Sequence, residues 1–367
     1  MAIYSPFASV YYARRTDQAP GGGAELQSSL LARGLAKRGL RVAHIVYPIP
    51  EPIRFEPPSP TLVERARHRG GGGLGWLAEG RAIWRGLDRA DASVCVVRGS
   101  GGHLMPAAAF SRSHRRRLVF STSNDLDFDF ERHDRNRLIL RGYRYSIRGA
   151  DRVVVQTRQQ ERLARQALPR VEPVVIPSFA EAAEPVSGEP EYFLWADRLV
   201  EYKQPERCLE LAAALPEARF RMVGQPTSET PPGLKRRVEE RARSLPNVEL
   251  VSPRPREQLL AEMSRAAAVV TTSRAEGMPN TFLEAWARGI PALSLGFDPD
   301  GLIAGNRIGI AAGGSMERLI EGARTLWQDG GVRKEMGDSA RELVRSTHSP
   351  DAVAERWLAL IEGLLDG

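Results

Sequence analysis

Short apolar runs alternate with longer amphipathic segments along this chain. Runs such as residues 117–121 and 267–272 are rich in apolar residues and have the length of buried strands. Between the runs, segments such as residues 24–38 place apolar side chains at helical spacing. Buried strands separated by helices are typical of parallel sheets that are covered by helices on both faces. The pattern therefore predicts an α/β protein with doubly wound parallel sheets.

The same pattern divides the chain into two parts. The runs predicted as strands are residues 41–47, 92–97, 117–121, 152–155, 172–176, 191–195, 219–223, 248–251, 267–272 and 290–295. Residues 177–190 contain three prolines together with small and acidic residues, a composition typical of a linker. We therefore expect two α/β domains of similar size, followed by a strongly amphipathic helix over residues 351–365. Ligands of such domain pairs usually lie in the crevice between them.

Charge is distributed unevenly between the two parts. Residues 1–180 contain 29 arginines and lysines against 16 acidic residues, whereas residues 181–367 contain 23 against 29. A basic half favours acidic partners, and a solvated arginine-rich surface is the alternative. Few aromatic residues interleave with the arginines, so a phosphorylated or lipid-linked acceptor or an anionic membrane surface fits better than nucleic acid.

Composition excludes several classes of protein. The two cysteines, Cys95 and Cys208, exclude a disulfide scaffold and a cysteine-based zinc site. No stretch approaches 18 apolar residues, so we expect no transmembrane helix. Residues 1–7 lack the basic and apolar regions of a secretory signal. We therefore expect a cytoplasmic protein, either free or peripheral at the inner face of the membrane.

The strongest chemical signal lies in residues 267–285. A predicted buried strand runs into a glycine-containing loop, and Pro279 suits the first position of the helix that follows. The unpaired amides of Asn280, Thr281 and Phe282 would then form an anion site at the carboxyl end of the sheet.

Glu276 and Glu284 flank this turn. Carboxylates are disfavoured beside a phosphate, so both glutamates fit better as acceptors for the hydroxyl groups of a sugar or a ribose. The alternative is that Glu276 is an ordinary loop residue and Glu284 a solvated helix residue.

Residues 192–205 also read as a strand, a turn and the start of a helix, with Arg198 and Lys203 on the turn. Two cations there would offset the charge of a diphosphate without a metal ion and stabilise it as a leaving group. Lys203 is one of only four lysines among 52 basic residues, which indicates that a compact ammonium is needed at this position. The alternative is two surface cations.

A glycine-rich segment, Gly21-Gly22-Gly23, precedes the predicted helix in residues 24–38. Glycines before a helix let a ligand approach the backbone closely, and a flexible loop explains them equally well. They do not form the dinucleotide-binding fingerprint, which disfavours a nicotinamide-dependent dehydrogenase.

Two more groups of candidate residues follow predicted strands. Arg98 and His103 would contact an acceptor, unless His103 merely begins a helix. For Asn124, Asp125 and Asp127 three interpretations stay open: an Asp-x-Asp metal site, a contact to the acceptor or sugar, and a loop or helix cap.

The paired glutamates resemble a known motif. Glu276 and Glu284, in Glu-Gly-Met-Pro-Asn-Thr-Phe-Leu-Glu-Ala-Trp-Ala-Arg-Gly-Ile-Pro, are similar to the paired glutamates of glycosyltransferase family 4. Arg198 and Lys203 resemble the Arg…Lys phosphate pair of that family, and Gly22-Gly23-Ala24-Glu25 resembles its Gly-Gly-x-Glu loop. The resemblance covers most of the chain and is strongest from about residue 190 to 310.

The resemblance implies a role for each site residue. Glu284 would hold the ribose hydroxyls, Glu276 would bind hydroxyls of the transferred sugar, and Arg198, Lys203 and Glu276 would be catalytic. The residues expected to bind the donor are Gly22, Gly23, Arg198, Lys203, Glu276, Gly277, Met278, Pro279, Asn280, Thr281, Phe282, Leu283 and Glu284. The residues expected on the acceptor side are Arg98, His103, Asn124, Asp125 and Asp127, and none is expected to bind a metal.

The resemblance also implies a fold and a reaction. We expect the GT-B fold, with two Rossmann-like domains facing across a cleft. Residues 1–178 would form the acceptor domain, with residues 350–367 packing back on it, and residues 190–349 the donor domain. The reaction would move a sugar from a UDP- or GDP-linked donor to a hydroxyl group with retention and without a required cofactor, in the biosynthesis of cell-envelope polysaccharide or glycolipid.

Two positions depart from the family pattern. Asp197 stands where the family usually has Gly, and Asn124 lies near the position of a family His that contacts the donor sugar. Two other functions stay open: a nucleotide-sugar epimerase with the GT-B fold, and a non-catalytic protein that binds a nucleotide sugar or polysaccharide.

Overall fold

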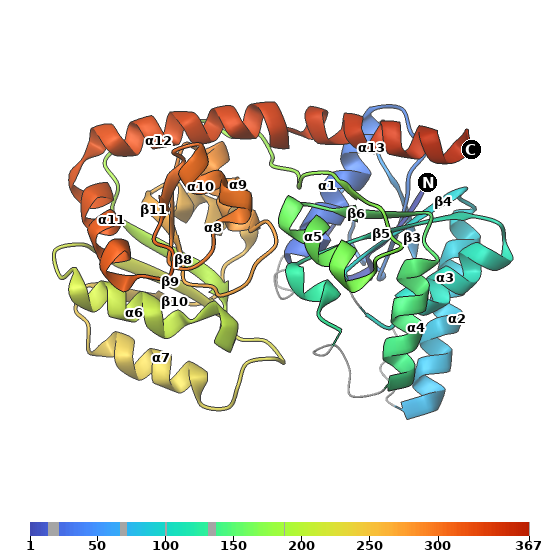
Figure 1. Ribbon diagram of the computed structural model, residues 1–367, viewed down its shortest axis with the longest axis horizontal. Coiled ribbons are helices and arrows are strands. Elements are labelled where there is room, and N and C mark those ends of the chain that lie inside the picture. The colour runs from blue at the N-terminus through green and yellow to red at the C-terminus, as the bar shows by residue number, and fades with distance from the viewer. Residues whose placement is uncertain (14–21, 67–71, 100, 131–136, 187, 367) are drawn as a thin grey trace. The chain divides into compact units, whose positions relative to one another are not determined.

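The computed structural model describes residues 1–13, 22–66, 72–99, 101–130, 137–186 and 188–366 (Figure 1). The chain divides into two compact units. The first comprises Met1–Phe179 and Pro350–Gly367, and the second comprises Ala180–Ser349. Among the described residues, no helix combines the length and the hydropathy that crossing a membrane requires.

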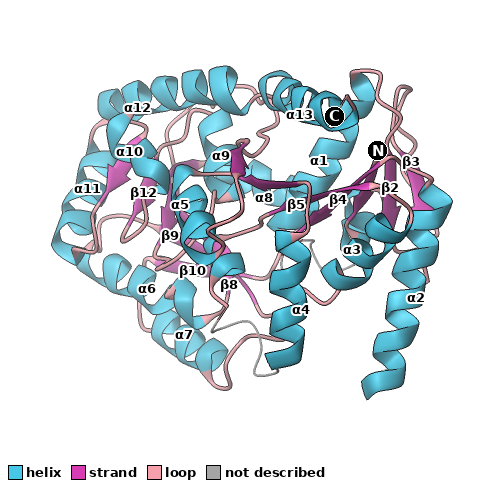
Figure 2. Cartoon of the chain, turned by 45° about the vertical axis from the view of Figure 1, so that its right-hand side comes forward, coloured by secondary structure: helices cyan, strands magenta, loops and turns pink. Residues whose placement is uncertain are grey.

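The first unit is built on a seven-stranded parallel sheet with the order β3-β2-β1-β4-β5-β6-β7. Figure 2 labels β2, β3, β4 and β5 of this sheet. The central strand β1 (Ala2–Tyr4) pairs with β2 (Ala43–Val46) on one side and β4 (Val94–Arg98) on the other. The winding direction therefore reverses between β1 and β4, which makes this the topological switch point. The other strands are β3 (Thr61–Glu64), β5 (Arg117–Ser121), β6 (Arg152–Val155) and β7 (Pro173–Val175).

Helices cover both faces of this sheet. They are α1 (Gly23–Lys37), α2 (Gly72–Ala90), α3 (Leu104–Ser113), α4 (Arg137–Arg148), α5 (Arg158–Ala167) and α13 (Pro350–Leu365), with the short 3₁₀ helices η1 (Pro6–Tyr11) and η2 (Asp125–Phe128). Helix α13 packs against α1, and Figure 1 shows the two helices crossing. The amphipathic stripe predicted from the sequence explains this packing, because Trp357 and Ile361 of α13 share one apolar cluster with Leu31 and Leu35 of α1.

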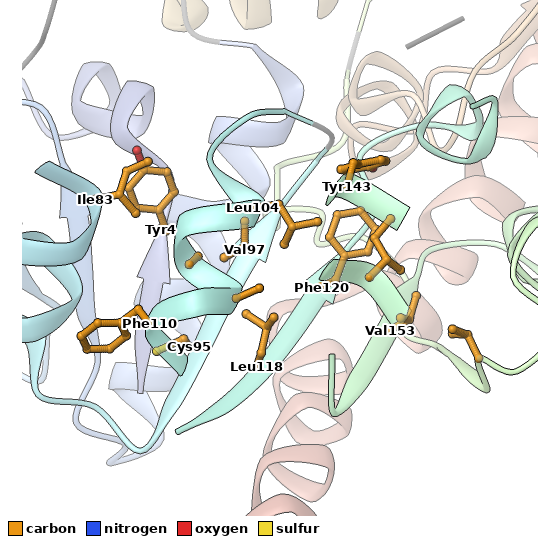
Figure 3. Close-up of a cluster of buried hydrophobic side chains, with 14 of the residues drawn as sticks. Tyr4, Ile83, Cys95, Val97, Leu104, Phe110, Leu118, Phe120, Tyr143 and Val153 are labelled. Carbon is orange, nitrogen blue, oxygen red and sulfur yellow. The ribbon is translucent and has the colours of Figure 1, made fainter. Parts of the chain in front are cut away.

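The opposite face carries the other half of the core (Figure 3). Tyr4, Cys95, Val97 and Phe120 belong to this cluster, whereas Ile3 belongs to the cluster under α1 and α13. Successive side chains of a strand point to opposite faces, so β1 supplies both clusters. Cys95 is a buried free cysteine in this cluster.

The second unit has a six-stranded parallel sheet with the order β10-β9-β8-β11-β12-β13. Its strands are β8 (Tyr192–Arg198), β9 (Phe220–Gln225), β10 (Val248–Val251), β11 (Ala266–Thr271), β12 (Ala292–Ser294) and β13 (Gly309–Ala311). The winding direction reverses between β8 and β11, so the switch point of this sheet lies between these two strands.

Two apolar clusters cover the two faces of the second sheet. Trp195 lies in one with residues of α6, α7 and α11, and Trp286 lies in the other with residues of α8 and α12. The helical elements are η3 (Glu201–Lys203), α6 (Pro205–Ala214), α7 (Leu234–Arg243), α8 (Arg256–Met263), α9 (Asn280–Ala287), η4 (Pro299–Gly301), α10 (Leu302–Gly305), α11 (Met316–Gln328), α12 (Gly330–Leu343) and the π-helix η5 (Val344–His348).

Every run predicted as a strand overlaps an observed strand, so the α/β class with parallel sheets is confirmed. The sequence pattern missed the three-residue strands β1 and β13 and the half-exposed strand β3. The predicted linker, residues 177–190, also differs from the structure at its start, because residues 176–180 are buried and packed. Gln27 donates to the carbonyl of Phe179 at 2.8 Å and accepts from its amide at 2.7 Å, which holds this segment against α1.

Candidate functional site

The strongest group of predicted residues meets at the switch point of the second sheet. Arg198 ends β8, and the loop with Glu276 leaves β11, which is the strand paired with β8. The carboxyl ends of parallel strands lie at one edge of the sheet, and a switch point leaves a crevice there. The topology therefore explains why two segments more than 70 residues apart bring their polar side chains together.

Lys203 is the centre of this group. Its side chain is 8% exposed, and its ammonium forms ion pairs with Oδ2 of Asp197 at 2.7 Å and with Oε1 of Glu276. Burial by itself would lower the pKa of Lys203, but the two carboxylates hold that pKa above its usual range. Lys203 is therefore a charged, fixed ammonium.

Glu276 is nearly as buried as Lys203, with 13% of its side chain exposed. Burial raises the pKa of the Glu276 carboxyl, and nearby Asp197 raises it further, while Lys203 opposes both effects. Two carboxylates that share one ammonium leave the group with one excess negative charge when both are ionised. The interpretation of Glu276 as an ordinary loop residue is therefore disfavoured.

Arg198 lies beside this group and is more accessible, with 39% of its side chain exposed. Its guanidinium donates to the hydroxyl of Tyr202 and forms an ion pair with Glu229 at 3.3 Å. Asp197 accepts from the backbone amide of Arg198 at 2.8 Å, so this carboxylate positions the end of β8 as well as Lys203.

The turn after Glu276 leads into α9, whose N-cap is Pro279. The prediction placed Pro279 one position later, inside the helix. One of the three amides expected to face an anion is already bonded, because Phe282 donates to the carbonyl of Pro279 at 3.1 Å. The side chains of Met278, Phe282 and Leu283 are buried in the core, so only their backbone groups can contact a ligand.

Glu284 lies one turn into α9, and 11% of its side chain is exposed. Burial raises the pKa of Glu284, and Arg256 opposes this by donating from Nε to Oε1 at 2.8 Å. Arg256 also forms an ion pair with Glu181 at 2.9 Å. Glu284 is therefore a buried, partnered carboxylate and not a solvated helix residue.

The predicted residues of the first unit lie near its own switch point. Arg98 ends β4 and donates to Oγ of Ser121 at 3.2 Å, and burial lowers its pKa to about 10. Burial also lowers the pKa of His103, whose ring centroid lies 5.5 Å from that of Tyr4. Gly22 caps α1, and Gly23 is its first residue, whereas Gly21 falls outside the described residues.

Asn124 and Asp127 form a helix cap. Asn124 is the N-cap of η2, and its side chain accepts from the amide of Leu126 at 2.8 Å. Oδ2 of the fully buried Asp127 accepts from the amide of Ser123 at 2.6 Å and from its hydroxyl at 3.0 Å. The cap is thus the interpretation that the geometry favours for these two residues. The described residues contain no group of three or more His, Cys, Asp or Glu side chains suited to a metal.

Sequence reasoning missed two partners in the site. Asp197 was noted only as a departure from the family pattern, yet it pairs with Lys203. Arg256, the partner of Glu284, carries no distinguishing signal among 52 basic residues. A separate pocket of about 370 Å³ between α7 and strands β9 and β10 is lined by none of the predicted site residues.

Two protein families match consecutive parts of the chain. Residues 22–178 match the glycosyl transferase 4-like domain, and residues 179–343 match the glycosyl transferases group 1. Together the matches extend over most of the chain and over every predicted site residue.

Solved structures show the same fold over the whole chain. Sucrose-phosphate synthase from Thermosynechococcus elongatus superposes with a TM-score of 0.79 at 16% identity, covering 100% of this chain and 98% of that one. HepE from Anabaena, in complex with UDP and glucose, gives a TM-score of 0.73 at 16% identity. The match covers 99% of this chain and 100% of that one. WaaG, a glycosyltransferase involved in lipopolysaccharide biosynthesis, gives a TM-score of 0.65 at 18% identity. The match covers 96% of this chain and 98% of that one. The chain therefore belongs to the group 1 glycosyltransferases, with a glycosyl transferase 4-like domain ahead of the group 1 domain, and has their GT-B fold.

Proposed function

We propose that this protein is a retaining glycosyltransferase that moves a sugar from a nucleoside diphosphate sugar to a hydroxyl acceptor. The observation that carries the proposal is the fixed ammonium of Lys203, held between Asp197 and Glu276 at the switch point of the second sheet. Arg198 and the first turn of α9 lie at the same edge of that sheet. In this proposal the second unit takes the donor, and the first unit takes the acceptor.

The bond that breaks joins the anomeric carbon of the sugar to the diphosphate, and the acceptor oxygen forms the new bond. Lys203 and Arg198 would stabilise the negative charge that builds up on the departing diphosphate. Glu276 would accept hydrogen bonds from the sugar, and Glu284 from the ribose. No protein residue is assigned as the base, and the departing phosphate would take the proton of the acceptor. In this proposal Arg198 and Lys203 supply the positive charge that meets the diphosphate, and no metal ion is required.

We infer a membrane-bound or phosphorylated acceptor, in the biosynthesis of cell-envelope polysaccharide or glycolipid, from the surface of the first unit. Helix α4 exposes large apolar side chains, with Leu138 74% and Tyr145 62% exposed, and it also exposes Arg141 and Arg148. HepE is described in complex with UDP-glucose, which makes UDP-sugars the first donors to test. A basic surface with exposed apolar side chains is typical of proteins that bind at an anionic membrane from the cytoplasmic side.

The test is calorimetric titration with UDP, GDP, ADP and their common sugar derivatives, without added metal. Glu284→Ala should weaken binding of the preferred nucleotide, since it removes the proposed ribose acceptor. The matched control is Glu257→Ala, which removes an exposed glutamate of α8 in the same unit and should leave binding unchanged. No nucleotide binding by the wild type, even with magnesium, would contradict the proposal.

The same samples separate the alternative functions. A transferase consumes the donor sugar fastest when a hydroxyl acceptor is present, and the anomeric configuration of the product is read by NMR. An epimerase would isomerise the donor without an acceptor, and a binding protein would bind it without turnover.

A further inference from the structure

An arginine-lined pocket lies in the first unit, away from the residues discussed above. Its volume is about 440 Å³, and its lining includes Arg112, Arg115, Arg116, Arg117, Gly149 and Asp151. These residues come from the end of α3, the turn into β5 and the connection from α4 to β6. Arg117 begins β5, whereas the predicted acceptor residues Asn124, Asp125 and Asp127 follow its other end, so about 13 Å of strand separates the two places.

The pocket has an excess of positive charge. Arg117 forms an ion pair with Asp151 at 3.1 Å, and Arg116 pairs with Asp91 at 2.7 Å. Among the residues that the structure describes, Arg112 and Arg115 form no ion pair with a carboxylate. Asp151 is the single carboxylate in the lining. Guanidinium groups that share a pocket repel one another unless an anion lies between them.

The backbone is arranged to bring these arginines together. Arg115 has φ 53°, a left-handed conformation that costs energy for a residue with a side chain and that turns the chain sharply from α3 into β5. The amide of Arg116 donates to the carbonyl of Ser111 at 2.7 Å, which caps the end of α3. The carbonyl groups at the C-terminus of a helix repel an anion, and a carbonyl that already accepts a hydrogen bond repels it less than a free carbonyl does.

Gly149 makes room for one guanidinium. A Cβ atom at this position would lie 2.8 Å from Nη2 of Arg112, which is closer than atoms pack. The guanidinium of Arg112 also lies over the ring of Tyr145, with its Cζ 4.9 Å from the ring centroid. Stacking leaves the N–H groups at the rim of the guanidinium available for an oxyanion. Gly149 therefore leaves room for Arg112, and Tyr145 stacks on its guanidinium at the pocket.

We propose that this pocket binds a phosphate group at a site separate from the donor diphosphate site. A planar guanidinium can donate two parallel N–H groups to phosphate oxygens, and two of these arginines, Arg116 and Arg117, form ion pairs with Asp91 and Asp151. The phosphate belongs either to a free phosphorylated molecule or to a phospholipid headgroup. This inference does not depend on the function proposed for the second unit.

The first experiment measures binding of inorganic pyrophosphate by calorimetry. The double variant Arg112→Ala/Arg115→Ala should weaken binding at this site at least tenfold. Gly149→Ala should weaken it as well, because the added methyl group displaces Arg112 without changing the charge. The control Arg81→Ala/Arg85→Ala removes two exposed arginines of α2 and should change the affinity by less than about twofold. Thermal unfolding of each variant checks that it is folded.

Arg198→Ala distinguishes this site from the donor site. If pyrophosphate binding falls in Arg198→Ala but not in Arg112→Ala/Arg115→Ala, the pocket is not a phosphate site, and the donor assignment still stands. If the Arg112/Arg115 and Arg81/Arg85 variants lose pyrophosphate affinity equally, the binding reflects only general attraction to a basic surface. That result would also overturn the proposal.

A second arm identifies the source of the phosphate. Vesicles of phosphatidylcholine with phosphatidic acid are compared with vesicles of phosphatidylcholine alone in a flotation assay. A phospholipid headgroup is the source if the wild type floats only with phosphatidic acid, if pyrophosphate competes, and if the Arg112/Arg115 variant no longer floats. A free phosphorylated molecule is the source if pyrophosphate binds the pocket but the Arg112/Arg115 variant floats as the wild type does.

Discussion

The ammonium of Lys203 lies 2.7 Å from Oδ2 of Asp197 and is shared with the carboxylate of Glu276. A cation that is proposed to meet a diphosphate is thus already neutralised by its neighbours. The other cation, Arg198, is also paired, with Glu229. An incoming diphosphate therefore has to compete with carboxylates for both positive charges.

Replacement of Asp197 tests this competition. We expect Asp197→Asn to bind the preferred nucleoside diphosphate about three- to tenfold more tightly, because a neutral amide no longer competes with the diphosphate for the ammonium of Lys203. The amide oxygen can still accept from the backbone of Arg198, so the end of β8 should keep its shape. Calorimetry at two salt concentrations measures the effect.

The matched control for Asp197→Asn is Asp338→Asn. Asp338 is an exposed acid of the same unit that pairs with Lys334 at 2.6 Å, and its replacement should leave nucleotide affinity unchanged. Weaker binding by Asp197→Asn would mean that Asp197 mainly holds Lys203 in position.

Loss of Arg198 should affect the reaction far more than the stability. Arg198→Ala is expected to lower kcat/KM about 30- to 1000-fold, the range for losing about 2–4 kcal/mol of transition-state stabilisation. Its ion pair with Glu229 is exposed, so the free energy of unfolding should change by less than about 1 kcal/mol. Steady-state kinetics and urea unfolding measure the two effects, with the exposed Arg207→Ala as control.

Lys203→Ala should lower both kcat/KM and the free energy of unfolding. It removes the same kind of charge stabilisation and also leaves Asp197 and Glu276 buried without their cation. Removal of one partner from a buried ion pair costs about 3–5 kcal/mol of stability. If both Arg198→Ala and Lys203→Ala keep full activity, the diphosphate assignment is wrong.

The sequence predicted which residues meet at this edge of the second sheet, but it did not predict all of their ion-pair partners. Glu276 and Lys203 were found because each follows a buried apolar run, and the ends of paired parallel strands have to meet. The partnership of Arg256 with Glu284 depends on how α8 packs beside α9, which no local pattern records. Strand β3 was missed for a related reason, since a half-exposed edge strand lacks the apolar run that marks a buried one.

The exposed apolar residues of α4 give a test of membrane association. We expect Leu138→Ser to reduce binding to anionic vesicles about tenfold, because it removes a large apolar side chain that would enter the interface. Vesicle sedimentation with phosphatidylglycerol measures the binding. The control is Leu250→Ser, which changes an exposed leucine of β10 in the second unit. Equal binding by Leu138→Ser and the wild type would speak against α4 as a membrane contact.

A buried histidine should make the first unit sensitive to acid. His44 in β2 is fully buried, its Nδ1 lies 2.7 Å from the hydroxyl of Tyr12, and burial lowers its pKa to about 3. An unfolded chain has a histidine pKa of about 6.5, so below that pH the unfolded state takes up a proton that the folded state does not. The folded state should therefore lose about 1.4 kcal/mol for each pH unit between about 6 and 3 from this group alone.

His44→Gln removes the titrating group and keeps a side chain that can bond to Tyr12. The unfolding free energy of the first unit, measured by hydrogen exchange of buried amides in β2 between pH 7 and pH 5, should therefore fall less steeply than in the wild type. This variant should start from a lower stability at pH 7, so the slope and not the absolute value is compared. His114→Gln, at an exposed position, is the control and should retain the wild-type slope. Parallel slopes for His44→Gln and the wild type would show that protonation of His44 does not drive the loss of stability in acid.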